Sequence, residues 1–109
     1  KNVKIWGSGN NRREYMYVED FVDFLYFSLN NFNKIPNTIN IGMGKDHKIK
    51  DYYYLVSKIL KYKIKLVKII KPEGQKQKLM DIRLLKKIGW KPKIGIKEGI
   101  VRTIESLYN

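Results

Sequence analysis

Apolar residues recur at spacings of three and four in four segments of the chain, which is the period of an α-helix with one apolar face. The longest such face is predicted between residues 18 and 32 and comprises Val18, Phe21, Val22, Leu25, Leu29 and Phe32. Further helices are predicted at 49–60, at 82–88 with Asp81 as the N-cap, and from about Lys97 onward. An apolar face of this kind normally packs against the core.

Shorter apolar runs lie between these helices and predict strands. They cover residues 3–6, 38–41 and 64–70, and a further short extended stretch covers 15–17. Glycine-containing turns end the first two of these strands. The alternation of strands and helices predicts a small mixed α/β domain.

Length and composition narrow the class of protein. The 109 residues suit one domain at most, and 43% hydrophobic residues are enough for a modest core. No apolar run approaches the ~18 residues of a membrane-spanning helix. Cysteine is absent and His47 is the only histidine, which excludes a disulfide framework and a cysteine nucleophile and argues against a histidine metal cluster. Because the chain begins at Lys1 without a methionine, we expect residues 1–109 to be a fragment of a longer protein.

The net charge of +13 raises the question of a nucleic-acid partner. Lys, Ile, Asn and Tyr, which all have AT-rich codons, supply 51 of the 109 residues, so genome composition explains much of the charge. Only four basic residues are arginine, the side chain best suited to bidentate recognition of phosphates and bases. Lysine is also scattered over nearly every predicted element, so nucleic-acid binding is retained only as an alternative.

Three candidate sites have simpler structural explanations. The turn 42–44 has the Gly-x-Gly start of a dinucleotide fingerprint, but His47 stands where the third glycine is needed, so no cofactor is expected there. Glu19, Asp20 and Asp23 suit the positive end of a helix dipole better than a metal site. His47 itself lies in a polar turn and is interpreted as a surface residue rather than a catalytic base.

Two loops combine features of a ligand site. Residues 6–15 hold a tryptophan, a glycine turn and two arginines, and residues 71–78 hold Pro72, Gly74 and several cations. Glycine lets the backbone approach a ligand closely, and arginine offers a fork for phosphate oxygens. Either loop alone is typical of an ordinary basic surface loop.

Taken together and in order, these segments resemble a known family. The matching pieces are Trp6-Gly7-Ser8-Gly9, Arg13-Glu14-Tyr15, Tyr17-Val18-Glu19-Asp20, Ile39-Asn40-Ile41-Gly42-Met43-Gly44, Pro72-Glu73-Gly74, Lys78-Leu79-Met80-Asp81 and Gly89-Trp90-Lys91-Pro92. Nearly the whole chain is similar to the C-terminal, substrate-binding part of the GDP-L-fucose synthase branch of the NAD-dependent epimerase/dehydratase family, which are extended short-chain dehydrogenases/reductases. The loop from Pro72 to Asp81 is what narrows the resemblance to this branch.

The resemblance implies a division of labour between two domains. The whole enzyme would use NADPH to epimerise and reduce GDP-4-keto-6-deoxy-mannose in the cytoplasm, with a homodimer as a possible assembly. The family's glycine fingerprint and Ser/Tyr/Lys catalytic set belong to an N-terminal Rossmann domain, and this chain contains neither. The chain is therefore expected to bind the GDP-sugar, to bind no cofactor or metal itself, and to expose apolar surface where the Rossmann domain would pack.

Four site residues follow from the resemblance. Trp6 would pack near the sugar nucleotide, Arg13 would neutralise the diphosphate, Glu73 would contact the GDP moiety and Lys78 would lie near the substrate. The chain departs from the family where Glu73 replaces an Asp, Lys76 a Pro, Gln77 an Arg and Lys48 a Thr. These departures leave another nucleotide-sugar epimerase or reductase open, and a stand-alone interaction domain is a further alternative.

Overall fold

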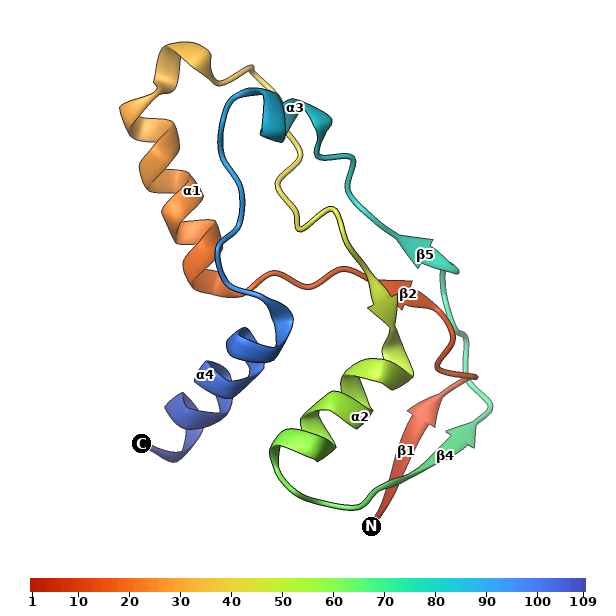
Figure 1. Cartoon of the computed structure of the whole chain (residues 1–109). Helices are drawn as coiled ribbons and strands as arrows, with labels where there is room; N and C mark the ends of the chain where they lie inside the picture. The colour runs from red at the N-terminus through yellow and green to blue at the C-terminus, as the bar shows by residue number, and fades with distance from the viewer. The chain divides into compact units, whose positions relative to one another are not determined.

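The computed structural model describes all 109 residues, which form two compact units. The first unit comprises residues 1–13 and 46–78, and the second comprises 14–45 and 79–109. The helices are α1 (Val18–Asn30), α2 (Ile49–Ile59), α3 (Arg83–Lys87) and α4 (Ile96–Tyr108), and the strands are β1 (Asn2–Trp6), β2 (Arg12–Arg13), β3 (His47–Lys48), β4 (Lys65–Ile69) and β5 (Gln77–Lys78) (Figure 1). The predicted mixed α/β class is confirmed. None of the helices has both the length and the apolar character needed to pass through a membrane.

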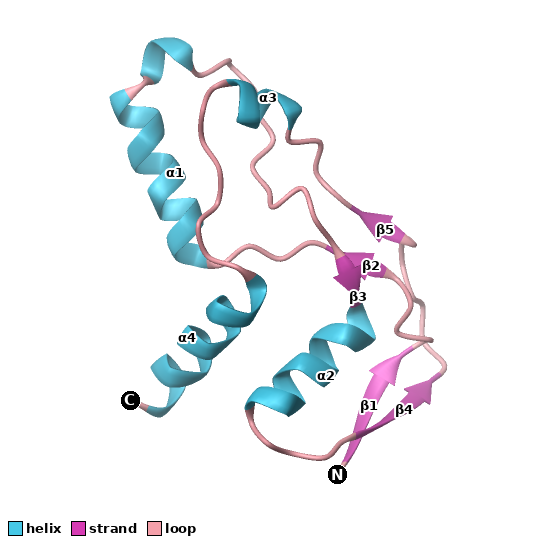
Figure 2. Ribbon diagram, viewed as in Figure 1, coloured by secondary structure: helices cyan, strands magenta, loops and turns pink.

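In the first unit, β1 and β4 run parallel to each other, and the long connection between them ends with α2 (Figure 2). Two parallel strands need a long crossover of this kind, because a short turn cannot return the chain to the same end. The loop after β1 satisfies the first N–H groups of α2: Ile49 donates to the carbonyl of Asn11 at 2.9 Å, and Lys50 donates to the carbonyl of Gly9 at 3.0 Å. The loop is thereby fixed against the start of the helix.

The first unit also contains a small sheet with the strand order β3–β2–β5 (Figure 2). β2 runs antiparallel to β3 and parallel to β5. In this register, Arg13 lies opposite His47 on one side and Lys78 on the other. Each strand has only two residues, so the alternation of apolar and polar residues that identifies longer strands is absent.

The core of the second unit is formed by Phe24 of α1, Leu85 of α3 and Trp90. The rings of Phe24 and Trp90 meet edge to face, with centroids 5.3 Å apart. Half-buried apolar residues surround this cluster, namely Met16, Phe27, Ile39, Ile41, Ile82 and Ile88.

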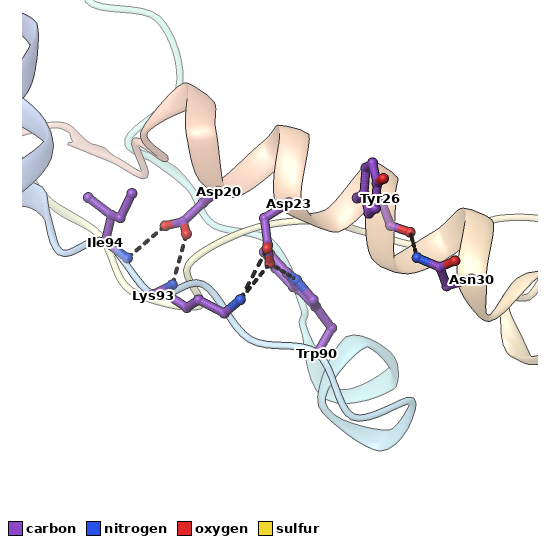
Figure 3. A network of polar contacts seen from close by, with 7 residues as sticks. All are labelled: Asp20, Asp23, Tyr26, Asn30, Trp90, Lys93 and Ile94. Carbon is purple, nitrogen blue, oxygen red and sulfur yellow. Dashed lines mark hydrogen bonds and ion pairs between the residues drawn. The ribbon is translucent and has the colours of Figure 1, made fainter.

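Two carboxylates of α1 hold the segment that follows α3 against this core (Figure 3). The buried Asp20 accepts the backbone N–H groups of Lys93 and Ile94, each at 2.9 Å. Asp23 accepts the indole N–H of Trp90 at 2.8 Å and pairs with the Lys93 ammonium at 3.1 Å. These hydrogen bonds lower the pKa of Asp23. The acidic residues at the start of α1 therefore act through tertiary contacts as well as through the helix dipole.

Glu14 makes a similar link within the second unit. Its carboxylate accepts the N–H of Gly44 at 2.6 Å and that of Met80 at 3.2 Å. A Cβ added at Gly42 would lie only 2.7 Å from the same carboxylate, so the turn 42–44 is closely packed against Glu14. The turn does not join a strand directly to a helix, as the dinucleotide fingerprint requires. The next helix, α2, begins five residues later and belongs to the first unit.

The apolar face predicted for α1 is present, but the structure exposes it. Val18, Phe21, Val22, Leu25, Leu29 and Phe32 are all exposed, whereas Asp20 and Phe24 on the opposite side are buried. Apolar residues surround most of this helix, so periodicity alone cannot tell which side faces the core. The hydrogen bonds of Asp20 and Asp23 decide the orientation.

The strand predicted at residues 38–41 is wrong. A strand needs a neighbour to satisfy its backbone groups, and no other strand pairs with these residues; Ile39 and Ile41 pack against the Phe24 cluster instead. The predicted stretch 15–17 likewise joins no sheet. Asp81 lies one residue before the observed N-cap of α3, yet its carboxylate accepts the N–H of Arg83 at 3.0 Å.

We predict that Asp20→Asn destabilises the protein by about 2 kcal/mol, because the amide would present a donor to one of the two N–H groups that the buried carboxylate now accepts. Chemical denaturation followed by near-ultraviolet circular dichroism measures the loss. Glu105→Gln, at an exposed position of α4 whose side chain makes no hydrogen bond, is the control. Equal stability of the two variants would contradict the assigned role of Asp20.

Candidate functional site

The four site residues predicted from the sequence, Trp6, Arg13, Glu73 and Lys78, all lie in the first unit. Trp6 ends β1 and pairs in register with Ile69, the last residue of β4. The loop after β1 leads to Arg13, and the loop after β4 contains Glu73 and leads to Lys78. Ligands of α/β folds commonly bind beyond the carboxyl ends of parallel strands. Trp6 is 63% exposed there, so it is accessible to a ligand.

The turn after Trp6 is tied to the second loop by Glu73. The Glu73 carboxylate accepts the backbone N–H of Ser8 at 2.8 Å and its hydroxyl at 3.1 Å. The Asn11 side-chain amide donates to the Glu73 carbonyl at 2.8 Å. Gly7 has a φ of +64°, and a Cβ at this position would overlap the Glu73 side chain. Glycine is therefore required here both by the backbone conformation and by the close approach of the carboxylate.

Arg13 keeps an uncompensated positive charge. Its guanidinium donates to the carbonyls of Arg12 at 2.7 Å and Gln75 at 2.8 Å, and it has no carboxylate partner. The other three arginines of the chain, Arg12, Arg83 and Arg102, all form ion pairs. Carbonyl acceptors orient the guanidinium without neutralising it, and its remaining N–H groups can bind an anion.

Arg12, the neighbour of Arg13, instead forms an ion pair with Asp46 within the first unit. Its Nε donates to Asp46 Oδ1 at 2.8 Å, and the Gln77 side-chain amide donates to Asp46 Oδ2 at 2.6 Å. The side chain of Asp46 is only 6% exposed. The hydrogen bond from Gln77 and the Arg12 guanidinium hold the pKa of the Asp46 carboxyl below its usual range, although burial opposes the shift.

Lys78 and His47 flank Arg13 in the small sheet. Lys78 is exposed and makes no ion pair. His47 is half-buried with its ring edge-on to that of Tyr52, at a centroid distance of 5.6 Å, so its prediction as a surface residue in a polar turn needs correction. The Tyr52 hydroxyl in turn donates to the carbonyl of Arg13 at 2.7 Å. The backbone of Arg13 is thus held from α2 while its side chain is held by the second loop.

Sequence reasoning missed Asp46, Arg12, Gln77 and Tyr52 as parts of this arrangement. Asp46 is 34 residues from Arg12 and 31 from Gln77, and the three short strands that bring them together have no periodic signal. A single sequence offers no sign of such a contact.

Comparison with known proteins shows which protein family the chain resembles. The profile of the NAD dependent epimerase/dehydratase family matches residues 1–42. The resemblance to this family, and to the extended short-chain dehydrogenases/reductases within it, is therefore confirmed.

Particular relatives are similar over almost the whole chain. The GDP-L-colitose synthase of Yersinia pseudotuberculosis is 44% identical over 108 residues, which is 98% of this chain and 35% of that protein. A GDP-L-fucose synthase of Azorhizobium caulinodans is 36% identical over 106 residues, which is 96% of this chain and 34% of that protein. The structure of a GDP-mannoheptose C4 reductase from Campylobacter jejuni, solved with NADP bound, matches all of this chain and 35% of its own with a TM-score of 0.86 and 32% identity. The chain spans about a third of the length of these relatives.

We predict that Glu73→Gln loosens the turn at Ser8, because an amide replaces one of the two accepting oxygens and removes the charge. The exchange rate of the Ser8 amide hydrogen should rise about tenfold, which corresponds to about 1.4 kcal/mol for one charge-assisted hydrogen bond. Hydrogen exchange followed by NMR measures this rate. Gln75→Ala, in the same loop, removes a side chain that makes no hydrogen bond and should leave the rate unchanged.

Proposed function

We propose that this chain is the nucleotide-sugar-binding part of an enzyme that modifies a GDP-linked deoxyhexose. The observation that carries the proposal is the unpaired guanidinium of Arg13, held by two carbonyls in the small sheet beside Lys78. A diphosphate is the anion that a planar guanidinium next to an ammonium group binds well. The names of the relatives support GDP as the nucleotide, since three of them act on or make GDP-sugars.

Each remaining candidate has a role that suits its surroundings. Trp6 offers an exposed ring on which a base or sugar can stack. Glu73 uses two of its acceptor positions on Ser8, and the others can accept a ligand hydroxyl, so we propose that it both holds the turn and contacts the GDP moiety. Lys78 supplies a second positive charge near the diphosphate.

The chain's own residues do not fit NADP. The turn 42–44 has the Gly-x-Gly start of the dinucleotide fingerprint, but it follows no strand, and its Gly44 N–H is already bound by Glu14. A pyrophosphate would meet the negative charge of the Glu14 carboxylate there. We propose that the cofactor, and the Ser/Tyr/Lys set that the family resemblance implies, belong to the remaining two thirds of a longer enzyme. A cytoplasmic location and a homodimer are proposed for that enzyme from the same resemblance.

The exposed side of α1 supports the proposal of a longer enzyme. Its apolar residues cover the side opposite to the Phe24 core and are unpartnered, namely Val18, Phe21, Val22, Leu25, Tyr26 and Leu29. A continuous exposed surface of this kind marks an interaction site. We propose that the Rossmann domain of the same enzyme covers it.

We predict that GDP raises the melting temperature of this protein and that Arg13→Ala weakens GDP binding 10-fold to 100-fold, the equivalent of about 1.5–3 kcal/mol for hydrogen bonds to a charged group. At a GDP concentration 100 times the Kd, the wild-type protein should gain about 2.7 kcal/mol of stability. Thermal shift and calorimetric titration measure the two quantities.

Arg83→Ala is the matched control, because it removes an exposed arginine of the second unit and the same charge. Tripolyphosphate and UDP test whether the effect is specific. Equal stabilisation by all three ligands, or equal GDP binding by Arg13→Ala and wild type, would contradict the proposed function.

A separate prediction concerns the exposed side of α1. Replacing both Val22 and Leu29 with Glu should reduce the binding of an apolar dye such as ANS by this chain, while changing its stability by no more than about 0.5 kcal/mol, as is usual for exposed positions. Fluorescence titration and chemical denaturation measure these effects. The paired substitution of Lys97 and Ser106 with Glu on α4 is the control. A stability loss of several kcal/mol would show that the α1 face is buried within this chain.

A further inference from the structure

The sheet that carries Arg13 and Lys78 is too small to set its own register. β2, β3 and β5 have two residues each, so few ladder hydrogen bonds hold them. Even longer two-stranded ribbons are marginally stable in water. A slip of one residue would move each side chain to the opposite face of the sheet. In a slip that brings Arg13 beside Asp46, Arg13 would take the place of Arg12 and Glu14 would take the place of Arg13, so the site would lose its free guanidinium.

The side chain of Asp46 joins all three strands. It lies directly before β3, accepts Arg12 of β2 at one oxygen and accepts Gln77 of β5 at the other, at 2.8 and 2.6 Å. The Arg12 guanidinium also donates to the Asp46 backbone carbonyl at 3.1 Å. Because the Asp46 side chain is only 6% exposed, little water competes for these hydrogen bonds.

These contacts select which arginine is available. Because Arg12 is bound to Asp46, its side chain is committed to one face of β2, and the alternation of side chains along a strand places Arg13 on the other. On that face, Arg13 is in register with Lys78. Gln77 binds Asp46 without adding a charge, so the single negative charge of Asp46 is neutralised by Arg12 alone. The positive charges of Arg13 and Lys78 therefore remain for a ligand.

We infer that Asp46 is a positioning residue for the anion site, which it builds by fixing β2 between β3 and β5 and by occupying Arg12. The inference rests on the proposed function, since it names the residue that makes Arg13 available to a diphosphate. Asp46 acts through Arg13 and has no contact with the ligand itself.

A double-mutant cycle tests this inference with GDP as the ligand. Asp46→Asn should weaken GDP binding at least tenfold in calorimetric titration. In the Arg13→Ala background, the same substitution should weaken binding no further, because the residue through which it acts is gone. Asp46→Glu should restore part of the affinity. Asp51→Asn, an exposed position in the first turn of α2, makes the same change of charge and should bind GDP as wild type does.

Hydrogen exchange separates this role from a general loss of stability. The Arg12 N–H donates to the carbonyl of Lys76 at 2.8 Å, across β2 and the segment leading into β5. Asp46→Asn should speed exchange of this amide while the amides of β1 and β4 keep their wild-type rates. Should Asp46→Asn prove unfolded, Gln77→Leu removes one of the two hydrogen bonds and should give a smaller change of the same sign in both measurements.

The outcomes distinguish two kinds of failure. If Arg13→Ala binds GDP as well as wild type does, the proposed function is wrong and the inference falls with it. If Arg13→Ala loses binding but Asp46→Asn retains it, or if the two losses are additive, the proposed function stands and the role of Asp46 is wrong. Unchanged exchange at Arg12 in Asp46→Asn overturns the inference in either case.

Discussion

The pairing of Arg12 with the shielded carboxylate of Asp46 is the interaction on which the candidate site depends. Burying a carboxylate is costly unless it is paired and hydrogen-bonded, and Asp46 meets both conditions through Arg12 and Gln77. Because leaving such a group unpaired is costly, this contact stabilises the observed register of the three strands. A sheet of two-residue strands thereby acquires a defined geometry that its backbone hydrogen bonds could not provide. The free guanidinium of Arg13 is a consequence of this pairing.

The second unit uses carboxylates in the same manner. Asp20 and Glu14 each accept two backbone N–H groups from distant segments, so each carboxylate satisfies donors that the short helices and loops leave open. A small apolar core alone would hold these segments weakly, because only three apolar side chains of the second unit form its buried centre. Much of the remaining apolar surface lies on the exposed side of α1, where we propose that another part of a longer enzyme packs. The buried core of the second unit is small because many of the apolar side chains of α1 are exposed rather than packed within this chain.

The sequence predicts the long elements well and the site residues by resemblance, whereas the contacts that position the site are hidden from it. The periodicity of α1, α2 and α4 and the β-branched runs of β1 and β4 are local signals, and the structure confirms them. The apolar run at 38–41 has the same local signal as a strand but no partner within the chain. The orientation of α1 depends on Asp20, whose partners lie more than 70 residues away. Asp46 is hidden for the same reason, since pairing between distant polar residues leaves no pattern along the chain.

The net charge of +13 has a different meaning once the ion pairs are known. Of the four arginines, Arg12, Arg83 and Arg102 are neutralised by carboxylates within hydrogen-bond distance. The guanidinium of Arg13 donates to carbonyls alone. The many lysines are spread over both units and attract anions without selecting them, so they raise the background affinity for any polyanion, an effect that salt screens. A guanidinium held by two carbonyls selects by geometry, because its orientation is set before the ligand arrives. The proposed specificity for a diphosphate therefore has to come from the small sheet, whatever the total charge of the chain.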